Sequence, residues 1–257
     1  TPQAIQLNRQ TRIGSPTDRS VAPRDVDGAT LFVSRNGREI REFLFADSEQ
    51  AYQATDLALL ARHLVVRPVD QDYDQGRRLM LIVMADGTLG ALTLFRAEQV
   101  TAWTRIDTGG TIHSVAVVGD DVHLLVQRPE GFSTRWNIER LDDALHLDAG
   151  LYGESEAPVS VWSGLDHLNG KTIAIVADGV LRPDVTVSGG SITLDPPAST
   201  VEAGLPFTHV VEPLPPNPLN SGGGRGLAMR LVEVVFQLED TAALRADVGA
   251  GLTDFPL

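Results

Sequence analysis

The feature of this sequence that most limits its fold is a regular series of short apolar segments separated by tight turns. Between residues 79 and 141, runs of six to eight residues alternate with turns rich in Gly and Asp. Residues such as Val, Ile and Thr favour strands, whereas Gly and Asp favour turns. The expected strands are Leu79–Met84, Leu89–Phe95, Val100–Ile106, Ile112–Val118, Val122–Arg128 and Thr134–Leu141. This spacing is typical of a sandwich, a barrel or a propeller, so we expect a mainly β fold with a β-propeller-like or multi-sheet domain.

A hairpin and one short helix are expected before this region. The strands Thr30–Ser34 and Glu39–Phe45 flank Asn36-Gly37, which is the strongest short-range signal for a hairpin turn. Apolar residues then recur at helical spacing, which predicts one short helix over Asp56–Leu64 that ends before Pro68.

The second half of the chain predicts a small second β domain. Further strands are expected at Val159–Ser163, Thr172–Ala177 and Ser191–Leu194, with Thr200–Ala203 pairing at an edge. We therefore expect an arm or linker over residues 1–27, the propeller-like β domain over 28–150, the small β domain over 151–214, and a linker with a C-terminal β segment over 215–257. The last segment begins with a stiff proline-rich stretch and a flexible glycine run and contains one more expected strand, Leu227–Leu238.

A weak internal repeat favours the propeller among these architectures. Ile82–Gly87 resembles Ala174–Gly179, at a separation close to two propeller blades. The other interpretation is that two unrelated Asp-Gly turns each follow a buried strand.

Composition removes several classes of function. The chain has no cysteine, which excludes disulfides, cysteine nucleophiles and cysteine-ligated metals. It carries 34 acidic against 21 basic residues, a net charge of −13, and such a surface repels nucleic acid. No apolar run reaches the length of a membrane helix. The first residues, Thr1-Pro2-Gln3-Ala4, resemble neither an initiator segment nor a signal peptide, so we expect a piece of a longer protein.

Catalytic motifs are weak, and we predict no enzyme activity, no catalytic residues and no cofactor. The hydrolase elbow Gly-x-Ser-x-Gly is absent, and in Ser163–His167 a serine lies near an aspartate and a histidine only in sequence. His113 and His123 flank a turn that contains Asp120 and Asp121, where a metal site is the alternative to ordinary strand residues.

Three other segments allow two interpretations each. Asp70, Asp72 and Asp74 alternate like the start of a calcium loop, but the glycine and glutamate of such a loop are misplaced, which favours a solvated loop. The run Gly222–Gly226 lacks the ending of a phosphate loop and is interpreted as flexible. For the tryptophans we expect core or inter-blade packing, with a carbohydrate platform as the alternative; they are Trp103, Trp136 and Trp162.

Four segments of this sequence, taken in order, resemble one protein family. They are Leu31–Phe43, Ala54–Leu64, Gly164–Thr172 leading to Ala177-Asp178-Gly179, and Val187–Leu194 leading to Gly204–Phe207. Together they are similar to the tail nozzle, tail tubular B and stabilisation (hub) proteins of short-tailed bacteriophages. The likeness covers about residues 28–214.

The resemblance implies β-propeller-like and small β domains in a homo-oligomeric ring, usually a hexamer, around the DNA channel of the tail. It implies a role in tail closure and DNA ejection, contact with other tail proteins such as the adaptor, and a place in the virion after synthesis in the bacterial cytoplasm. The resemblance implies no catalytic residues. Proteins of this kind are generally much longer, and the likeness fades after Pro215.

Two other classes of protein are left open. One is a β-propeller that binds or hydrolyses glycans. The other is a host β-propeller scaffold unrelated to phage. A tail nozzle or hub protein could also come from a prophage or a gene-transfer particle.

Overall fold

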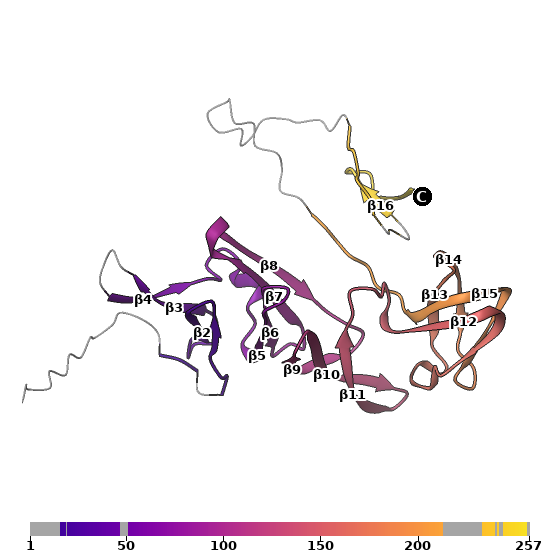
Figure 1. The fold of residues 1–257 in the computed structure, drawn as a ribbon, viewed down its shortest axis with the longest axis horizontal. Helices are drawn as coiled ribbons and strands as arrows, with labels where there is room; N and C mark the ends of the chain where they lie inside the picture. The colour runs from indigo at the N-terminus through magenta and orange to yellow at the C-terminus, as the bar shows by residue number, and fades with distance from the viewer. Residues whose placement is uncertain are drawn as a thin grey trace, which may run out of the picture. The chain divides into compact units, whose positions relative to one another are not determined.

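The structure is a computed structural model that describes residues 16–18, 20–46, 51–212, 233–239, 241 and 244–255. It divides the chain into two units, Thr1–Asp142 and Asp143–Leu257. Antiparallel sheets make up both units (Figure 1), which confirms the expectation of a mainly β, multi-sheet fold. The helical elements of the described residues are 3₁₀ helices of three residues each: η1 Arg62–Leu64, η2 Arg96–Glu98 and η3 Asp166–Leu168.

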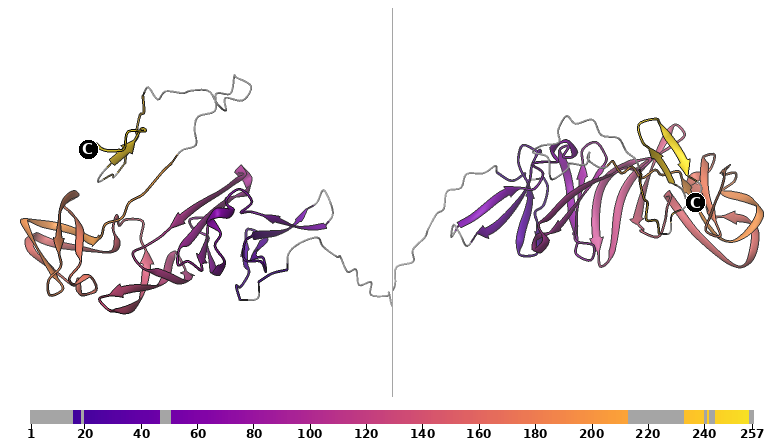
Figure 2. Two further views of the ribbon diagram at one scale, coloured as in Figure 1. Left: turned by 180° about the vertical axis from the view of Figure 1, so that it is seen from behind. Right: turned by 90° about the horizontal axis from the view of Figure 1, so that it is seen from above.

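Three sheets form the first unit, and each follows the chain from strand to neighbouring strand. The first sheet contains β1 Arg24–Val26, β2 Ala29–Val33, β3 Ile40–Ala46 and β4 Ala51–Asp56. The middle sheet contains β5 Pro68–Asp74, β6 Leu79–Met84, β7 Leu89–Phe95 and β8 Val100–Ile106. The third sheet contains β9 Thr111–Val118, β10 Asp121–Glu130 and β11 Ser133–Leu141. The sheets follow one another in sequence order (Figure 2), as successive blades of a propeller do.

The middle sheet is buried on both faces. Alternate residues of β6 contribute to two different cores, because successive side chains of a strand point to opposite faces. Met80, Ile82 and Met84 pack with residues of the first sheet, whereas Leu81 and Val83 pack with residues of the third sheet. Burial on both sides explains why Leu79–Met84 is an uninterrupted apolar run. Each such side chain contributes about 1.5–3 kcal/mol relative to an exposed position.

The second unit has a sheet of different order. Its strands are β12 Asp148–Ser163, β13 Thr172–Ala177, β14 Val180–Thr186 and β15 Ser191–Leu205, arranged as β12-β15-β13-β14. Thr200–Ala203 therefore lies within β15, between two strands, and not at an edge. A core that includes Leu168, Ile173 and Ile175 fills this unit. A separate hairpin joins β16 Leu244–Asp247 to β17 Leu252–Phe255.

The segment predicted as a short helix is a turn followed by η1. Residues 57–60 form turns and the helical part begins at Arg62. Tertiary partners explain the shortening: Leu57 N–H donates to Ile40 O, and Leu57 O accepts the Trp103 indole N–H. Because Leu57 O bonds to Trp103, it does not accept the Ala61 N–H as it would in an α-helix, and that N–H donates to Ala58 O instead. Leu60, on the expected apolar face, is 95% exposed.

Several elements were not expected from the sequence. The strand β1 lies in the predicted arm and β5 in the predicted loop, and no strand was predicted at β4 or β14. The structure divides the units after Asp142, a few residues before the expected boundary at 150. Of the expected strand Leu227–Leu238, the first part lies outside the described residues, and residues 233–238 are not a strand.

Candidate functional site

A cleft opens in the first unit between the β2–β3 turn and η1. Its volume is about 520 Å³. The lining residues are Asn36, Arg38, Glu39, Arg62, His63 and Val65. The turn is formed by Gly37, whose φ of 65° is in the left-handed region that favours glycine, as expected for an Asn-Gly hairpin. The hairpin therefore presents Asn36 and Arg38 at the cleft.

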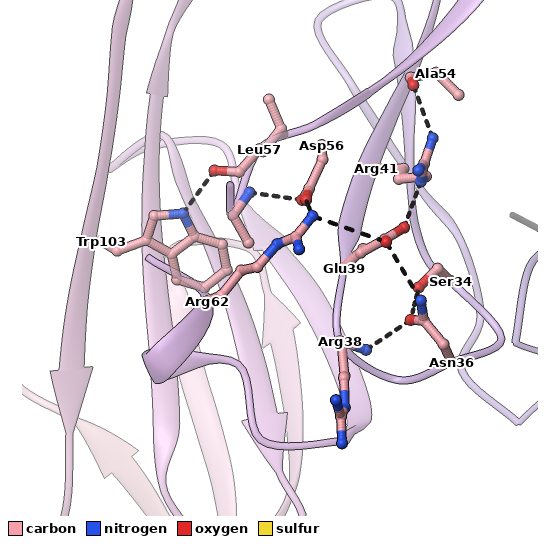
Figure 3. Close-up of polar contacts among 11 residues, drawn as sticks. Ser34, Asn36, Arg38, Glu39, Arg41, Ala54, Asp56, Leu57, Arg62 and Trp103 are labelled. Atoms are coloured by element: carbon pink, nitrogen blue, oxygen red, sulfur yellow. Dashed lines mark hydrogen bonds and ion pairs between the residues drawn. The ribbon is translucent and has the colours of Figure 1, made fainter. Parts of the chain in front are cut away.

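Among the described residues that line the cleft, the one carboxylate is engaged by its neighbours. Glu39 accepts hydrogen bonds from Arg41 Nε at 2.7 Å and from Asn36 Nδ2 at 3.3 Å (Figure 3). The hydrogen bond from Arg41 is the main reason that the pKa of Glu39 is below its usual value. Arg62 lies 3.0 Å from Asp56 and 4.0 Å from Glu39. Glu39 is thus held as an ion and is not poised to exchange a proton.

The guanidinium of Arg38 takes no part in the hydrogen bonds and ion pairs around Glu39 (Figure 3). Its backbone N–H donates to Asn36 Oδ1 at 2.9 Å, but its guanidinium points away from the other labelled side chains (Figure 3). No ion pair joins that guanidinium to any of the described residues. The cleft can therefore attract a small anion, although exposed charge pairs contribute only about 0–1 kcal/mol each.

Two sheet faces at the ends of the first unit are apolar and exposed. The first-sheet outer face is the side of β3 and β4 that carries Phe43, Phe45 and Tyr52; Phe45 is 45% exposed. The third-sheet outer face is the side of β10 and β11 that carries Leu125, Gln127, Trp136 and Ile138; Ile138 is 79% exposed. Residues opposite each other in a ladder share a face, which places Ile138 beside Leu125 and Trp136 beside Gln127.

The outward side of β11 carries two apolar residues. Trp136 and Ile138 occupy alternate positions of the strand and are 50% and 79% exposed. The inward face instead carries Glu139, which accepts from the buried Arg128 guanidinium at 2.5 Å. The expectation of core or inter-blade packing for all three tryptophans is therefore wrong for Trp136, which is 50% exposed. It holds for Trp103 and Trp162, which pack against the cores of the first and second unit.

A row of polar groups lies along one end of the third-sheet outer face. The His113 ring lies 4.6 Å from the Trp136 ring, and His113 Nε2 lies 3.2 Å from Gln127 Oε1. Gln127 Nε2 donates to Thr134 Oγ1 at 3.1 Å. Gln127 and Thr134 also line a hollow of about 320 Å³ beside Gly110.

The aspartates of the possible calcium loop are strand residues, so the prediction of a solvated loop is also wrong. Asp70, Asp72 and Asp74 lie on one side of β5. Asp70 accepts hydrogen bonds from Ser114 and Val115 of β9. Asp74 is buried and pairs with Arg77 at 2.8 Å. Their carboxylates are bound to protein groups on different partners and do not converge on one point.

The histidines and aspartates around the β9–β10 turn do not converge either. His123 lies opposite Ala116 in the ladder, whereas His113 contacts Trp136 and Gln127 farther along the sheet. Asp121 lies 3.7 Å from Arg140. Within the described ranges, no three His, Cys, Asp or Glu side chains form a group that could hold a metal ion.

The serine, aspartate and histidine of residues 163–167 are not a triad. His167 Nε2 lies 3.0 Å from the carbonyl oxygen of Ala149, and Ser163 ends β12 in register with Ser191. The neighbouring His146 was not singled out by any sequence pattern. Its backbone N–H and Nδ1 both contact the buried Glu202, which connects the start of the second unit to β15.

Comparisons with known proteins assign no family to this chain. No family model and no curated protein matches it. In the part of the chain that the structure describes, no helix is both long and apolar enough to cross a membrane. The run Gly222–Gly226 lies outside the described residues.

Proposed function

We propose that this protein is a structural component of the tail of a short-tailed bacteriophage, or of a prophage or gene-transfer particle. In this proposal it forms part of a nozzle or hub ring around the DNA channel and acts in tail closure and DNA ejection. The observation that carries the proposal is the stack of three blade-like sheets with an exposed apolar face at each end. Apolar faces of this kind are typical of subunits that assemble.

The contacts of the candidate polar residues and of Glu39 in the cleft support a structural role over an enzymatic one. Asp70 and Asp72 bind the edge of β9, His167 binds a backbone carbonyl, and Glu39 is held by two arginines. Each of these groups supports the fold. The resemblance of four segments to tail nozzle and hub proteins supplies the biological context, with the adaptor and other tail proteins as partners in the virion.

Deletion of the gene from its phage or prophage tests this proposal. Particles without the protein should assemble and fill their heads, but they should lack the tail tip and lose DNA, because the channel is not closed. Restoring the gene should return stable particles. Deletion particles that keep complete tails and their DNA would contradict the proposal.

A second candidate function, glycan binding, has one observation in its favour. Trp136 is half exposed and lies beside His113, in a row that continues through Gln127 to Thr134 and borders a hollow. An exposed ring next to hydrogen-bonding groups suits a sugar. A glycan array with wild-type protein and Trp136→Ala would detect it, since binding should appear with the first and disappear with the second.

A further inference from the structure

We propose that the cleft between the β2–β3 turn and η1 binds a carboxylate that belongs to an acidic segment of another protein. The Arg38 guanidinium holds the carboxylate, and the rest of the cleft takes the chain on either side of it. The cleft volume of about 520 Å³ lies within the usual range of ligand sites, about 300–1,000 Å³. The proposal goes beyond the tail assignment and does not depend on it, because it rests only on residues of the first unit.

The border of this cleft is basic in an otherwise acidic chain. The segments 35–41 and 61–67 supply its lining residues and contain five arginines and one acid, Glu39. The arginines are Arg35, Arg38, Arg41, Arg62 and Arg67. The whole chain, in contrast, has 34 acidic residues against 21 basic ones. An acidic ligand at the cleft therefore meets a local charge opposite in sign to the net charge of −13.

Two of these arginines are engaged inside the protein, whereas Arg38 is not. Arg41 pairs with Glu39 at 2.7 Å. Arg62 pairs with Asp56 at 3.0 Å. The Arg38 guanidinium forms no ion pair with the described residues and points away from the other labelled side chains (Figure 3). The lining is thus left with the positive charge of one guanidinium, which matches the charge of one carboxylate.

The charges of the cleft favour a carboxylate over a phosphate. A guanidinium donates two parallel hydrogen bonds to the two oxygens of a carboxylate. It can do the same for a phosphate monoester, but that group carries about 1.5–2 negative charges, and Glu39 already belongs to the lining. Duplex DNA brings many more charges, which the acidic remainder of the chain repels. A short acidic segment meets only the basic border.

The remaining lining residues suit the atoms of a peptide on either side of the carboxylate. Asn36 Nδ2 donates one hydrogen bond to Glu39, and its second N–H can donate to a peptide carbonyl. Val65, which is 6% exposed, contributes an apolar side chain to the lining. Because a single carboxylate fills only a small part of the cleft, a segment of chain fits it better than a small free acid.

Titration of the isotope-labelled protein with end-blocked peptides tests the site by NMR. A short peptide of alternating Glu and Gly should shift the signals of Arg38 Nε–H and the Asn36 side-chain amide to saturation. The same peptide with Gln in place of Glu should not. Arg38→Ala should weaken binding of the Glu peptide at least about tenfold, because a charged hydrogen-bonded pair is lost. Arg38→Lys should recover only part of the affinity, since an ammonium group lacks the planar fork.

Arg35→Ala is the matched control. Arg35 is exposed and close in sequence but does not line the cleft, so its removal takes away the same charge and leaves the site intact. Affinity for the Glu peptide should change by less than about threefold. Circular dichroism checks that the variants fold as the wild-type protein does, which is expected because the Arg38 side chain has no ion pair among the described residues.

Four outcomes would overturn the proposal. The first is the absence of saturable shifts with the Glu peptide. The second is an equal loss of affinity in Arg35→Ala and Arg38→Ala, which would indicate diffuse attraction. The third is binding of free glutarate as tight as that of the peptide, because the occupant would then be a small acid. The fourth is binding of inorganic phosphate or duplex DNA that requires Arg38 and is tighter than binding of the peptide.

Discussion

The carboxylate of Asp72 accepts a hydrogen bond from the backbone N–H of Val117 at 2.8 Å. Two residues earlier in β5, Asp70 does the same for Val115 at 3.1 Å. Val115 and Val117 belong to β9, which is an edge strand of the third sheet, and β5 is an edge strand of the middle sheet. The two carboxylates thus occupy backbone donors that a further strand could otherwise pair with. They close this edge and connect the two sheets.

Removing these carboxylates should destabilise the first unit. Asp70→Ala and Asp72→Ala should each lower the free energy of unfolding by about 1–3 kcal/mol, because partly buried backbone donors lose a charged acceptor. Urea denaturation followed by fluorescence measures the change. Asp107→Ala is the matched control: Asp107 is 64% exposed and lies 3.8 Å from Arg105, so its loss should change stability by less than about 0.5 kcal/mol. Equal effects of all three variants would contradict the role of β5.

The hairpin turn provides a second prediction. Gly37 has a φ of 65°, where a β-branched residue is strained. Gly37→Val should therefore lower the free energy of unfolding by more than about 1 kcal/mol. Gly37→Asn is the matched variant, since asparagine tolerates this conformation better, and it should cost clearly less. Identical melting temperatures for the two variants would show that the turn does not have this conformation.

The buried pair Asp74–Arg77 should make stability depend on pH. Burial opposes ionisation of Asp74, but hydrogen bonds from the Arg77 side chain and backbone outweigh it and lower the pKa of Asp74 below its usual value. A lowered folded-state pKa adds stability above the unfolded pKa of about 3.9, and that stability is lost as the pH falls through the folded value.

Asp74→Asn measures this contribution. At pH 7 the variant should be less stable than the wild-type protein by about 1–3 kcal/mol. The difference should shrink below about pH 4, as Asp74 of the wild-type protein becomes protonated. Denaturation at several pH values records it. A difference that stays constant down to the acid limit would contradict the assigned pKa shift.

Net charge leads to a fourth prediction, on DNA. A tail channel must let DNA slide, and rows of Lys and Arg would retain it through its phosphates. With a net charge of −13, we expect the protein to bind duplex DNA negligibly even at low salt, where attraction is least screened. Fluorescence anisotropy of a labelled duplex tests this. We also expect acids to outnumber bases on the channel-facing surface of the ring, and a lumen lined by Lys and Arg would contradict the sliding account.

Much of the fold follows from local sequence signals. The strands Leu79–Met84, Leu89–Phe95, Val100–Ile106 and Thr172–Ala177 begin and end where the pattern predicts. Their boundaries are encoded by adjacent Gly and Asp turns, such as Asp86-Gly87 with a φ of 83° at Gly87. Turn signals of this kind depend on a few neighbouring residues, so they can be interpreted without knowledge of the tertiary structure.

The candidate surfaces could not be derived in the same way. β5 looks like a loop because its aspartates face a partner strand about 45 residues away, a contact that no local pattern contains. Trp136 was expected in the core or between blades, but it lies on the outward side of β11, because the inward side carries Glu139, which pairs with Arg128. An apolar period shows that a face is to be buried, but it does not show which surface buries it.

Counting the protein in purified tails tests the central claim most directly. Quantitative mass spectrometry of tails isolated from the phage or induced prophage should find several copies of this chain per tail, in a constant ratio to the portal and adaptor. That ratio follows if the protein forms a ring in the nozzle or hub. Its absence from intact, infectious tails would contradict the claim.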